Sequence, residues 1–99
     1  MDGPFSDAVR VACFSDEVRK VLQDVLNHVV AKNESYGDSA LNPIRIFSSA
    51  DWRAGLYVRI DDKLSRVRSQ QEWPGDDTIL DLIGYLVLLR IGRAREVRE

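Results

Sequence analysis

Apolar side chains return every three or four residues in the first third of the chain, from Val18 to Val30. This spacing gathers them on one face of a helix. Ser15 stands just before the pattern and is suited to an N-cap position. The pattern therefore predicts a helix over residues 15–33, and residues 1–14 are expected to form an N-terminal arm or a short helix.

The following stretch has no such period. Residues 34–50 combine Gly37 with a run of polar side chains, which is typical of a loop. A loop of this length in a small domain is often functional. A second helix is expected over residues 51–69, opened by Ser48 and Asp51 at the spacing of a capping box.

A third helix, expected over residues 76–92, is apolar on almost every side. A helix of this kind is buried on most sides. Because a chain of 99 residues can hardly cover it completely, part of it is expected to pack against another subunit. Residues 93–99 are charged and are expected to form a solvated tail. The chain is thus predicted to be a single all-α domain over residues 1–99: a small helical bundle of three to four helices, with a long loop after the first main helix, that forms a homo-oligomer through the apolar third helix.

The charge and composition of the chain argue against several classes of partner and metal site. The net charge of −2 provides no basic footprint, which argues against a nucleic-acid partner. The longest mainly apolar stretch, residues 79–91, is too short to cross a bilayer, so no membrane partner is expected. The single cysteine, Cys13, excludes a cysteine-cluster zinc site, and the single histidine, His28, excludes sites that need two histidines.

Two acids interrupt the most apolar helix. Asp77 and Asp81 are four residues apart and therefore lie on one face, which they share with Gly84. A carboxylate in such a setting is costly unless it is paired or binds a metal. In one interpretation, Asp81 pairs with an arginine of the second helix, and Asp77 is a first-turn acid that the helix dipole stabilises. In the other, both carboxylates bind a hard cation such as Mg²⁺.

The second helix carries a cluster of charges around Asp62. Arg66 lies four residues after Asp62, in the favourable acid-first orientation for an ion pair. This pattern is typical of a solvated, salt-bridged face. Alternatively, Asp62 points toward the two acids of the third helix, and Arg59, Lys63 and Arg66 bind phosphate groups.

Two further positions have a structural and a functional interpretation. Tyr36, Gly37 and Asp38 are typical of a helix C-terminal turn in which Gly37 is left-handed, and a loop that contacts substrate is the alternative. His28 lies one position from the apolar stripe of the first helix. That position favours a half-buried helix residue over a catalytic base.

Three segments, taken in order, resemble a known family. They are Lys32–Asp38, Arg59–Arg66 and Asp77–Tyr85. Their residues and spacing resemble the nucleotide-modification-associated domain, a small helical family found largely in phages and prophages. That family is similar to the MazG-like all-α nucleoside triphosphate pyrophosphatases. The resemblance covers about residues 20–90.

The resemblance implies an oligomeric helical bundle and a reaction. In MazG-like enzymes, acidic residues on two adjacent helices hold Mg²⁺, the metal binds the triphosphate, and water attacks to release a nucleoside monophosphate and pyrophosphate. Carried over by position, the catalytic acids and metal ligands are Asp62, Asp77 and Asp81. The substrate-binding positions are Tyr36, Gly37, Asp38, Arg59, Lys63 and Arg66.

Departures from the family pattern leave two functions open. Ser35 and Trp73 stand where the family motifs usually carry acids, and each lost carboxylate weakens a cation site. The first hypothesis is a nucleotide-binding domain or Mg²⁺-dependent pyrophosphohydrolase of phage nucleotide metabolism, located in the cytoplasm of the cell or phage host. The second is a catalytically inactive helical module that binds another protein, in which the acids only pair with Arg59 and Arg66.

Overall fold

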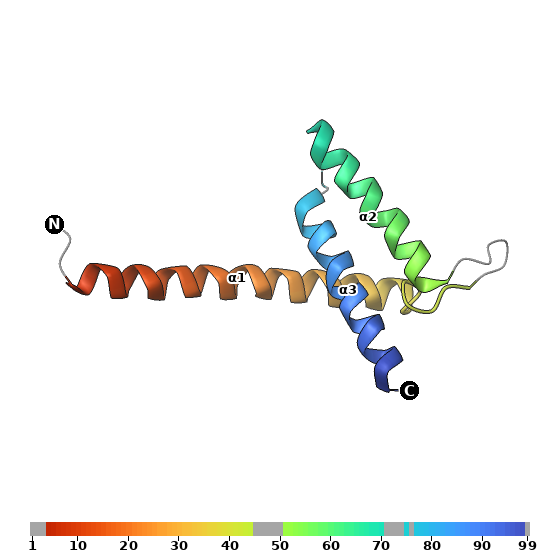
Figure 1. The fold of residues 1–99 in the computed structure, drawn as a ribbon, viewed down its shortest axis with the longest axis horizontal. Helices are drawn as coiled ribbons and strands as arrows, with labels where there is room; N and C mark the ends of the chain where they lie inside the picture. Colours follow the sequence, from red (N-terminus) through yellow and green to blue (C-terminus); the bar gives the residue numbers. More distant parts are fainter. Residues whose placement is uncertain (1–3, 45–50, 71–74, 76, 99) are drawn as a thin grey trace.

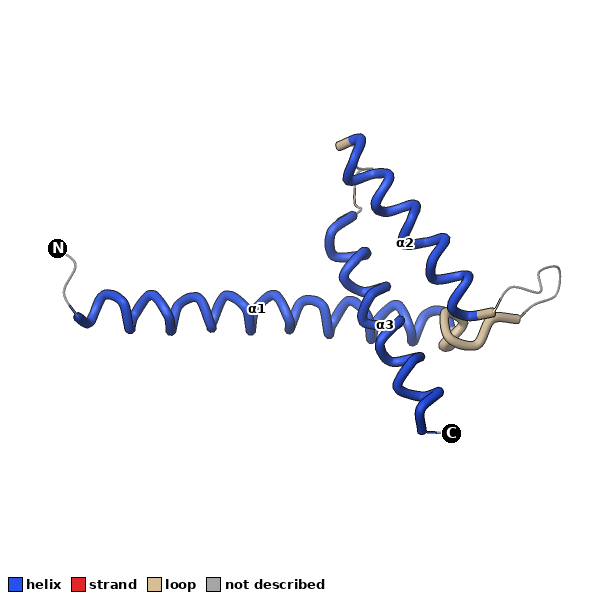
Figure 2. The backbone as a smooth tube through the Cα atoms, viewed as in Figure 1, coloured by secondary structure: helices blue, strands red, loops and turns tan. Residues whose placement is uncertain are grey.

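A computed structural model describes residues 4–44, 51–70, 75 and 77–98 of the chain. Within these ranges the protein has three helices and no strand (Figures 1 and 2), so the all-α prediction is confirmed. The helices are α1 (Pro4–Tyr36), α2 (Trp52–Ser69) and α3 (Thr78–Arg98). In the part of the chain that is described, no helix is long and apolar enough to cross a membrane.

The three helices form an open arrangement. Helix α3 packs along α2 and crosses the C-terminal third of α1 (Figure 1). The N-terminal half of α1 extends away from both other helices, and Figure 2 shows it as a straight rod. The molecule is accordingly elongated, with principal dimensions of 63 × 37 × 21 Å.

Helix α1 is longer than predicted at both ends. It begins at Pro4, a residue favoured in the first turn of a helix, and continues without a break through the segment predicted as an arm or a short helix. It ends at Tyr36 instead of residue 33. The chain then turns through Gly37 and Asp38, both at φ +61°, and the Asp38 amide donates to the Asn33 carbonyl. The predicted left-handed Gly37 is confirmed.

Helix α2 begins and ends close to the predicted positions. Its N-cap is Asp51, whose carboxylate accepts a hydrogen bond of 2.8 Å from the Ala54 amide. Its C-cap is Gln70, in a left-handed conformation that lets its amide reach the last carbonyls of the helix. Ser48, the other half of the predicted capping box, lies outside the described residues, as does the rest of the predicted loop from residue 45 to residue 50.

The predicted tail over residues 93–99 is exposed at residues 93–97, as expected, but it is not frayed, because α3 stays helical to Arg98. Tertiary contacts explain the added turns. Glu96 accepts hydrogen bonds from Trp52 Nε1 at 3.2 Å and from Arg53 at 2.6 Å, both at the start of α2. Arg95 pairs with the Asp38 carboxylate at 3.3 Å. The end of α3 is thereby attached to the start of α2 and to the turn after α1.

Gly92 is required where the start of α2 meets the end of α3. A Cβ atom at this position would lie 2.4 Å from the indole ring of Trp52, which leaves no room for alanine. We expect Gly92→Ala to lower the free energy of unfolding by about 1–3 kcal/mol, as for other overpacked sites. Gly55 in α2 is the matched control because no atom lies near its Cβ direction. Gly55→Ala should stabilise the protein by about 0.5–1 kcal/mol through helix propensity. Urea unfolding of both variants measures the difference, and equal effects would contradict the close contact.

The buried apolar core is small. Among the described residues it consists of Val25, Leu41 and Leu56. Ile79 and Leu86 of α3 are exposed in the single chain, whereas most other apolar residues of α3 are partly covered. Much of the apolar surface in this chain is therefore open to solvent.

Candidate functional site

Asp81 lies at the centre of the site, where all three helices meet. Its carboxylate is 6% exposed and faces three basic side chains. His28 Nε2 lies 2.7 Å and Lys32 Nζ 3.0 Å from Oδ1, both from α1, and Lys63 Nζ of α2 lies 3.1 Å from Oδ2. The carboxylate therefore links α3 to both other helices. Of the two interpretations of Asp81, its paired state agrees with this geometry, with a lysine of α2 in the place of the expected arginine.

The surrounding charges fix the ionisation of this group. Burial raises the pKa of Asp81, but hydrogen bonds from Lys32, Lys63 and His28 outweigh that effect and lower the pKa from 3.8 to about 2. Burial lowers the pKa of Lys32, but the hydrogen bond and charge of Asp81 raise it more, so the net shift is upward from 10.5. Both members of this pair therefore stay charged at neutral pH.

Helical spacing and one glycine bring these side chains together. His28 and Lys32 are four residues apart, so they project from the same face of α1. Asp81 and Gly84 share a face of α3, and both are buried. A Cβ at Gly84 would lie 3.3 Å from Val29 Cγ2 and 3.7 Å from His28 Cδ2. The bare glycine thus lets α1 approach α3 closely enough for His28 to reach Asp81.

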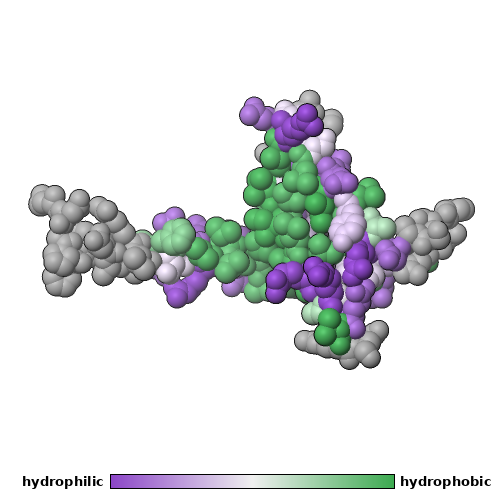
Figure 3. All heavy atoms as spheres, in the orientation of Figure 1, coloured by the Kyte–Doolittle hydropathy of each residue, from purple (hydrophilic) through white to green (hydrophobic). Residues whose placement is uncertain are grey.

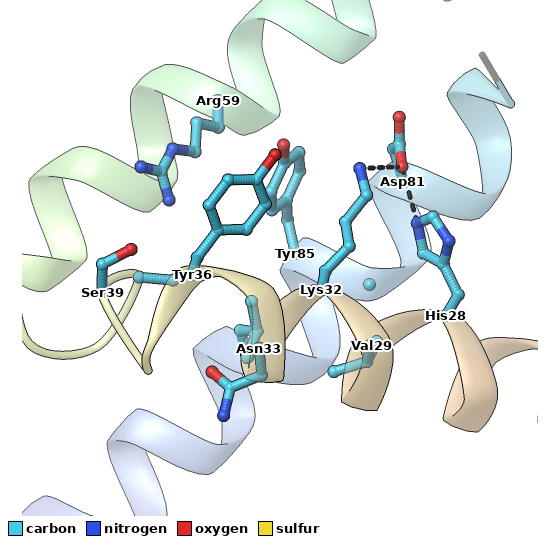
Figure 4. Close-up of a pocket in the computed structure, with 12 residues that line it drawn as sticks. His28, Val29, Lys32, Asn33, Tyr36, Ser39, Arg59, Asp81 and Tyr85 are labelled. Carbon is cyan, nitrogen blue, oxygen red and sulfur yellow. Dashed lines mark hydrogen bonds and ion pairs between the residues drawn. The ribbon is translucent and has the colours of Figure 1, made fainter. Parts of the chain in front are cut away.

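A cavity of about 270 Å³ opens beside Asp81, between α1, α2 and α3. Figure 4 shows that Lys32 and Tyr36 of α1, Tyr85 of α3 and Arg59 of α2 border it. The tyrosine rings provide flat apolar surface, and Lys32 and Arg59 provide positive charge. The remaining lining residues are His28, Val29, Asn33, Ser39, Ala40, Gly84 and Leu88.

Arg59 differs from the other basic groups of the site. Lys32 and Lys63 both contact Asp81. The guanidinium of Arg59, in contrast, has no acidic partner within 4 Å among the residues that the structure describes. In Figure 4 it lies at the edge of the cavity beside Tyr36 and Ser39. It is therefore available to an anionic group that enters the cavity.

The three predicted metal ligands have separate partners. Asp62 is 55% exposed and pairs with Arg66 at 3.3 Å, as in the surface-pair interpretation. Asp77 accepts a hydrogen bond of 3.0 Å from the Leu80 amide and so caps the start of α3. Asp81 is occupied by three basic groups. Among the described residues, no group of three or more acidic, histidine or cysteine side chains is placed to hold a metal ion, and the Mg²⁺ site stays a prediction.

Only two of the six predicted substrate-binding residues line the cavity. Tyr36 and Arg59 line the cavity. Gly37 and Asp38 form the turn after α1, where Asp38 accepts a hydrogen bond of 2.6 Å from Asn42. Lys63 points to Asp81, and Arg66 pairs with Asp62, so neither lines the cavity.

Sequence reasoning missed three important residues of the site. His28 was expected to be a half-buried helix residue, and its side chain is indeed 23% exposed, but its contact with Asp81 was not foreseen. Lys32 and Tyr85 stand at the ends of two segments that carry the family resemblance, yet neither was assigned a role. The i, i+4 spacing of His28 and Lys32 was a usable signal, because two basic groups on one helix face suit a buried acid on another helix.

Comparison with known proteins identified no relative of this chain. No protein-family model matches the chain, and no curated protein or solved structure is similar enough to count as a match. Any function of the chain must therefore be inferred from the geometry of the described residues.

Proposed function

We propose that the chain binds a phosphate-bearing nucleotide in the cavity beside Asp81. The observation that carries the proposal is Arg59 at the cavity edge, with no acidic partner among the described residues and with Lys32 across from it. Arginine is suited to phosphate because its planar guanidinium donates two parallel hydrogen bonds. A cation without a carboxylate partner favours an anion from solution.

The other lining residues suit the rest of a nucleotide. The rings of Tyr36 and Tyr85 offer faces on which a base can stack, and Asn33 and Ser39 offer polar groups for hydrogen bonds. A cavity of about 270 Å³ is at the small end for organic ligands, which favours one nucleoside unit with its phosphates reaching outward to Arg59. Hydrolysis with Mg²⁺ stays a prediction of the resemblance alone.

Titration calorimetry with ribo- and deoxynucleoside mono- and triphosphates tests this proposal, each with and without Mg²⁺. We expect Arg59→Ala to weaken binding about 10- to 100-fold, because a hydrogen bond to a charged group contributes about 1.5–3 kcal/mol. Arg68→Ala is the matched control, since Arg68 is exposed on the same helix and does not line the cavity. Binding that is absent across the panel, or equally weakened by both substitutions, would refute the proposal. Pyrophosphate released during the titration would extend it to hydrolysis.

The second candidate is the interaction module without catalysis. The observation in its favour is the extent of exposed apolar surface, which includes Phe14, Leu22, Val58 and Leu86. Large apolar patches on a protein surface mark sites of contact with other macromolecules. The two candidates differ in the calorimetric result, since the module predicts no heat with any nucleotide.

A further inference from the structure

The middle of α1, from residue 14 to residue 30, carries an apolar ridge that is exposed in the single chain. The ridge consists of Phe14, Val18, Leu22, Leu26 and Val30, each four residues after the last, and all five are exposed. Rows of side chains at this spacing are the ridges by which helices pack into the grooves of other helices. Figure 3 shows hydrophobic surface along α1 that continues toward the crossing with α3.

The part of α1 that precedes its crossing with α3 needs a partner to be stable. It makes no packing contact with α2 or α3, because α3 crosses only the other end of α1 (Figure 1). Isolated helices are marginal in water even when their residues favour helix, and α1 is rich in valine, which does not. A solvent-exposed Leu22, at 60% exposure, also forgoes most of the stabilisation that burial would give.

The chain as a whole exposes more surface than a compact monomer of its mass. A compact monomer of 11.3 kDa exposes about 5,700 Å² of surface, whereas this chain exposes 8064 Å². The radius of gyration agrees with this difference, at 17.7 Å against about 13 Å for a compact domain of this length. The excess over the whole chain is about 2,300 Å², and an obligate homodimer buries about 1,000–2,500 Å² on each subunit, so an interface of this class would bring the exposed surface down toward that of a compact protein.

The charges beside the ridge favour a second copy over a different protein. A two-fold interface places the same patch on both partners, so the patch must tolerate itself. Asp16, Glu17 and Asp24 lie between the ridge positions together with Arg19 and Lys20, so charges of both signs flank the ridge. A rim of mixed charge is self-complementary, whereas a rim of one sign would repel its own copy and select an oppositely charged partner.

We propose that a second copy of this chain docks on the α1 ridge and that the protein is a homodimer held together by α1. This surface is distinct from the cavity beside Asp81, so the proposal stands independently of nucleotide binding. It also places the contact between subunits on a different helix from the α3 interface that the sequence predicts.

The test compares the oligomeric state of two variants, one with a negative charge introduced on the ridge and one with the same charge introduced beside it. Light scattering after size exclusion should give wild-type protein a mass twice the chain mass of 11.3 kDa. Leu22→Glu should raise the dimer dissociation constant at least 100-fold. Gln23→Glu adds an equal charge one residue away, off the ridge, and should leave it within threefold of wild type.

A second measurement keeps the test decisive if Leu22→Glu fails to fold. The single cysteine, Cys13, is exposed next to Phe14, so wild-type protein can carry one spin label there. A dipolar coupling between two labels then arises only between chains. A folded wild-type monomer without such coupling at 100 µM would overturn the proposal. So would an oligomer that withstands Leu22→Glu but is dissociated by Leu86→Glu, since that result assigns the interface to α3.

Discussion

Replacement of Asp81 with asparagine is expected to lower the free energy of unfolding by about 3–5 kcal/mol, because removing one partner of a buried ion pair leaves the other charge without compensation. Lys63 is the group left in that state, since its side chain is 10% exposed and its ammonium faces Asp81 at 3.1 Å. Urea unfolding at one fixed protein concentration measures the effect. A loss of this size is a large fraction of the stability of a small domain.

Asp62→Asn is the matched control for this prediction. It makes the same chemical change in a 55% exposed carboxylate that pairs with Arg66 on the same helix. Pairs of this kind contribute about 0.3–0.5 kcal/mol. Equal losses in the two variants would show that Asp81 does not hold the helices together. The double variant Asp81→Leu with Lys63→Met should recover part of the loss, because apolar residues of similar size can replace a buried pair.

The same group predicts how stability responds to acid. The pKa of Asp81 is about 2 in the folded chain and 3.8 as its ordinary value, so the unfolded state binds the proton more tightly. The stabilisation from Asp81 is therefore complete above pH 3.8 and is lost as the pH falls toward 2, for a total of about 2 kcal/mol. The difference in the free energy of unfolding between wild type and Asp81→Asn should shrink by this amount as the pH falls from 3.8 to 2. An unchanged difference would contradict the lowered pKa.

Leu56→Ala is expected to lower the free energy of unfolding by about 2–5 kcal/mol, because it leaves a cavity in a core with few other members. Leu56 of α2 is the one described side chain with no exposed surface. Leu64→Ala on the same helix is the control, since Leu64 is 49% exposed and its truncation should cost less than half as much. If the two variants unfold at the same urea concentration, Leu56 does not lie in the core that the structure describes.

The periodic patterns predicted the helices well, and the errors lie where tertiary contacts decide. Helix α2 follows its local signals closely. The end of α3 was expected to be a frayed tail because its residues are charged, but Glu96 and Arg95 find partners on other elements. No local signal reveals a partner that is 43 residues away in the chain, as Arg53 is from Glu96.

The site was predicted in part for a related reason. The conflict between Asp81 and its apolar helix was visible in the sequence, and it identified the buried charge at the centre of the site. Which groups would satisfy that charge depends on the crossing of α1 and α3, which period and spacing do not specify. The sequence therefore pointed to arginines of α2, while the crossing supplies His28 and Lys32 of α1.

The single crossing between α1 and α3 has a consequence for local unfolding. Helix α3 packs more extensively on α2 than on α1, and His28 and Lys32 attach α1 to α3 through one carboxylate. Cooperative units within a protein open with free energies set by the contacts that join them. We therefore expect helix α1 to detach as a unit while the pair of α2 and α3 stays folded, and hydrogen exchange in its amides would report that opening separately from global unfolding.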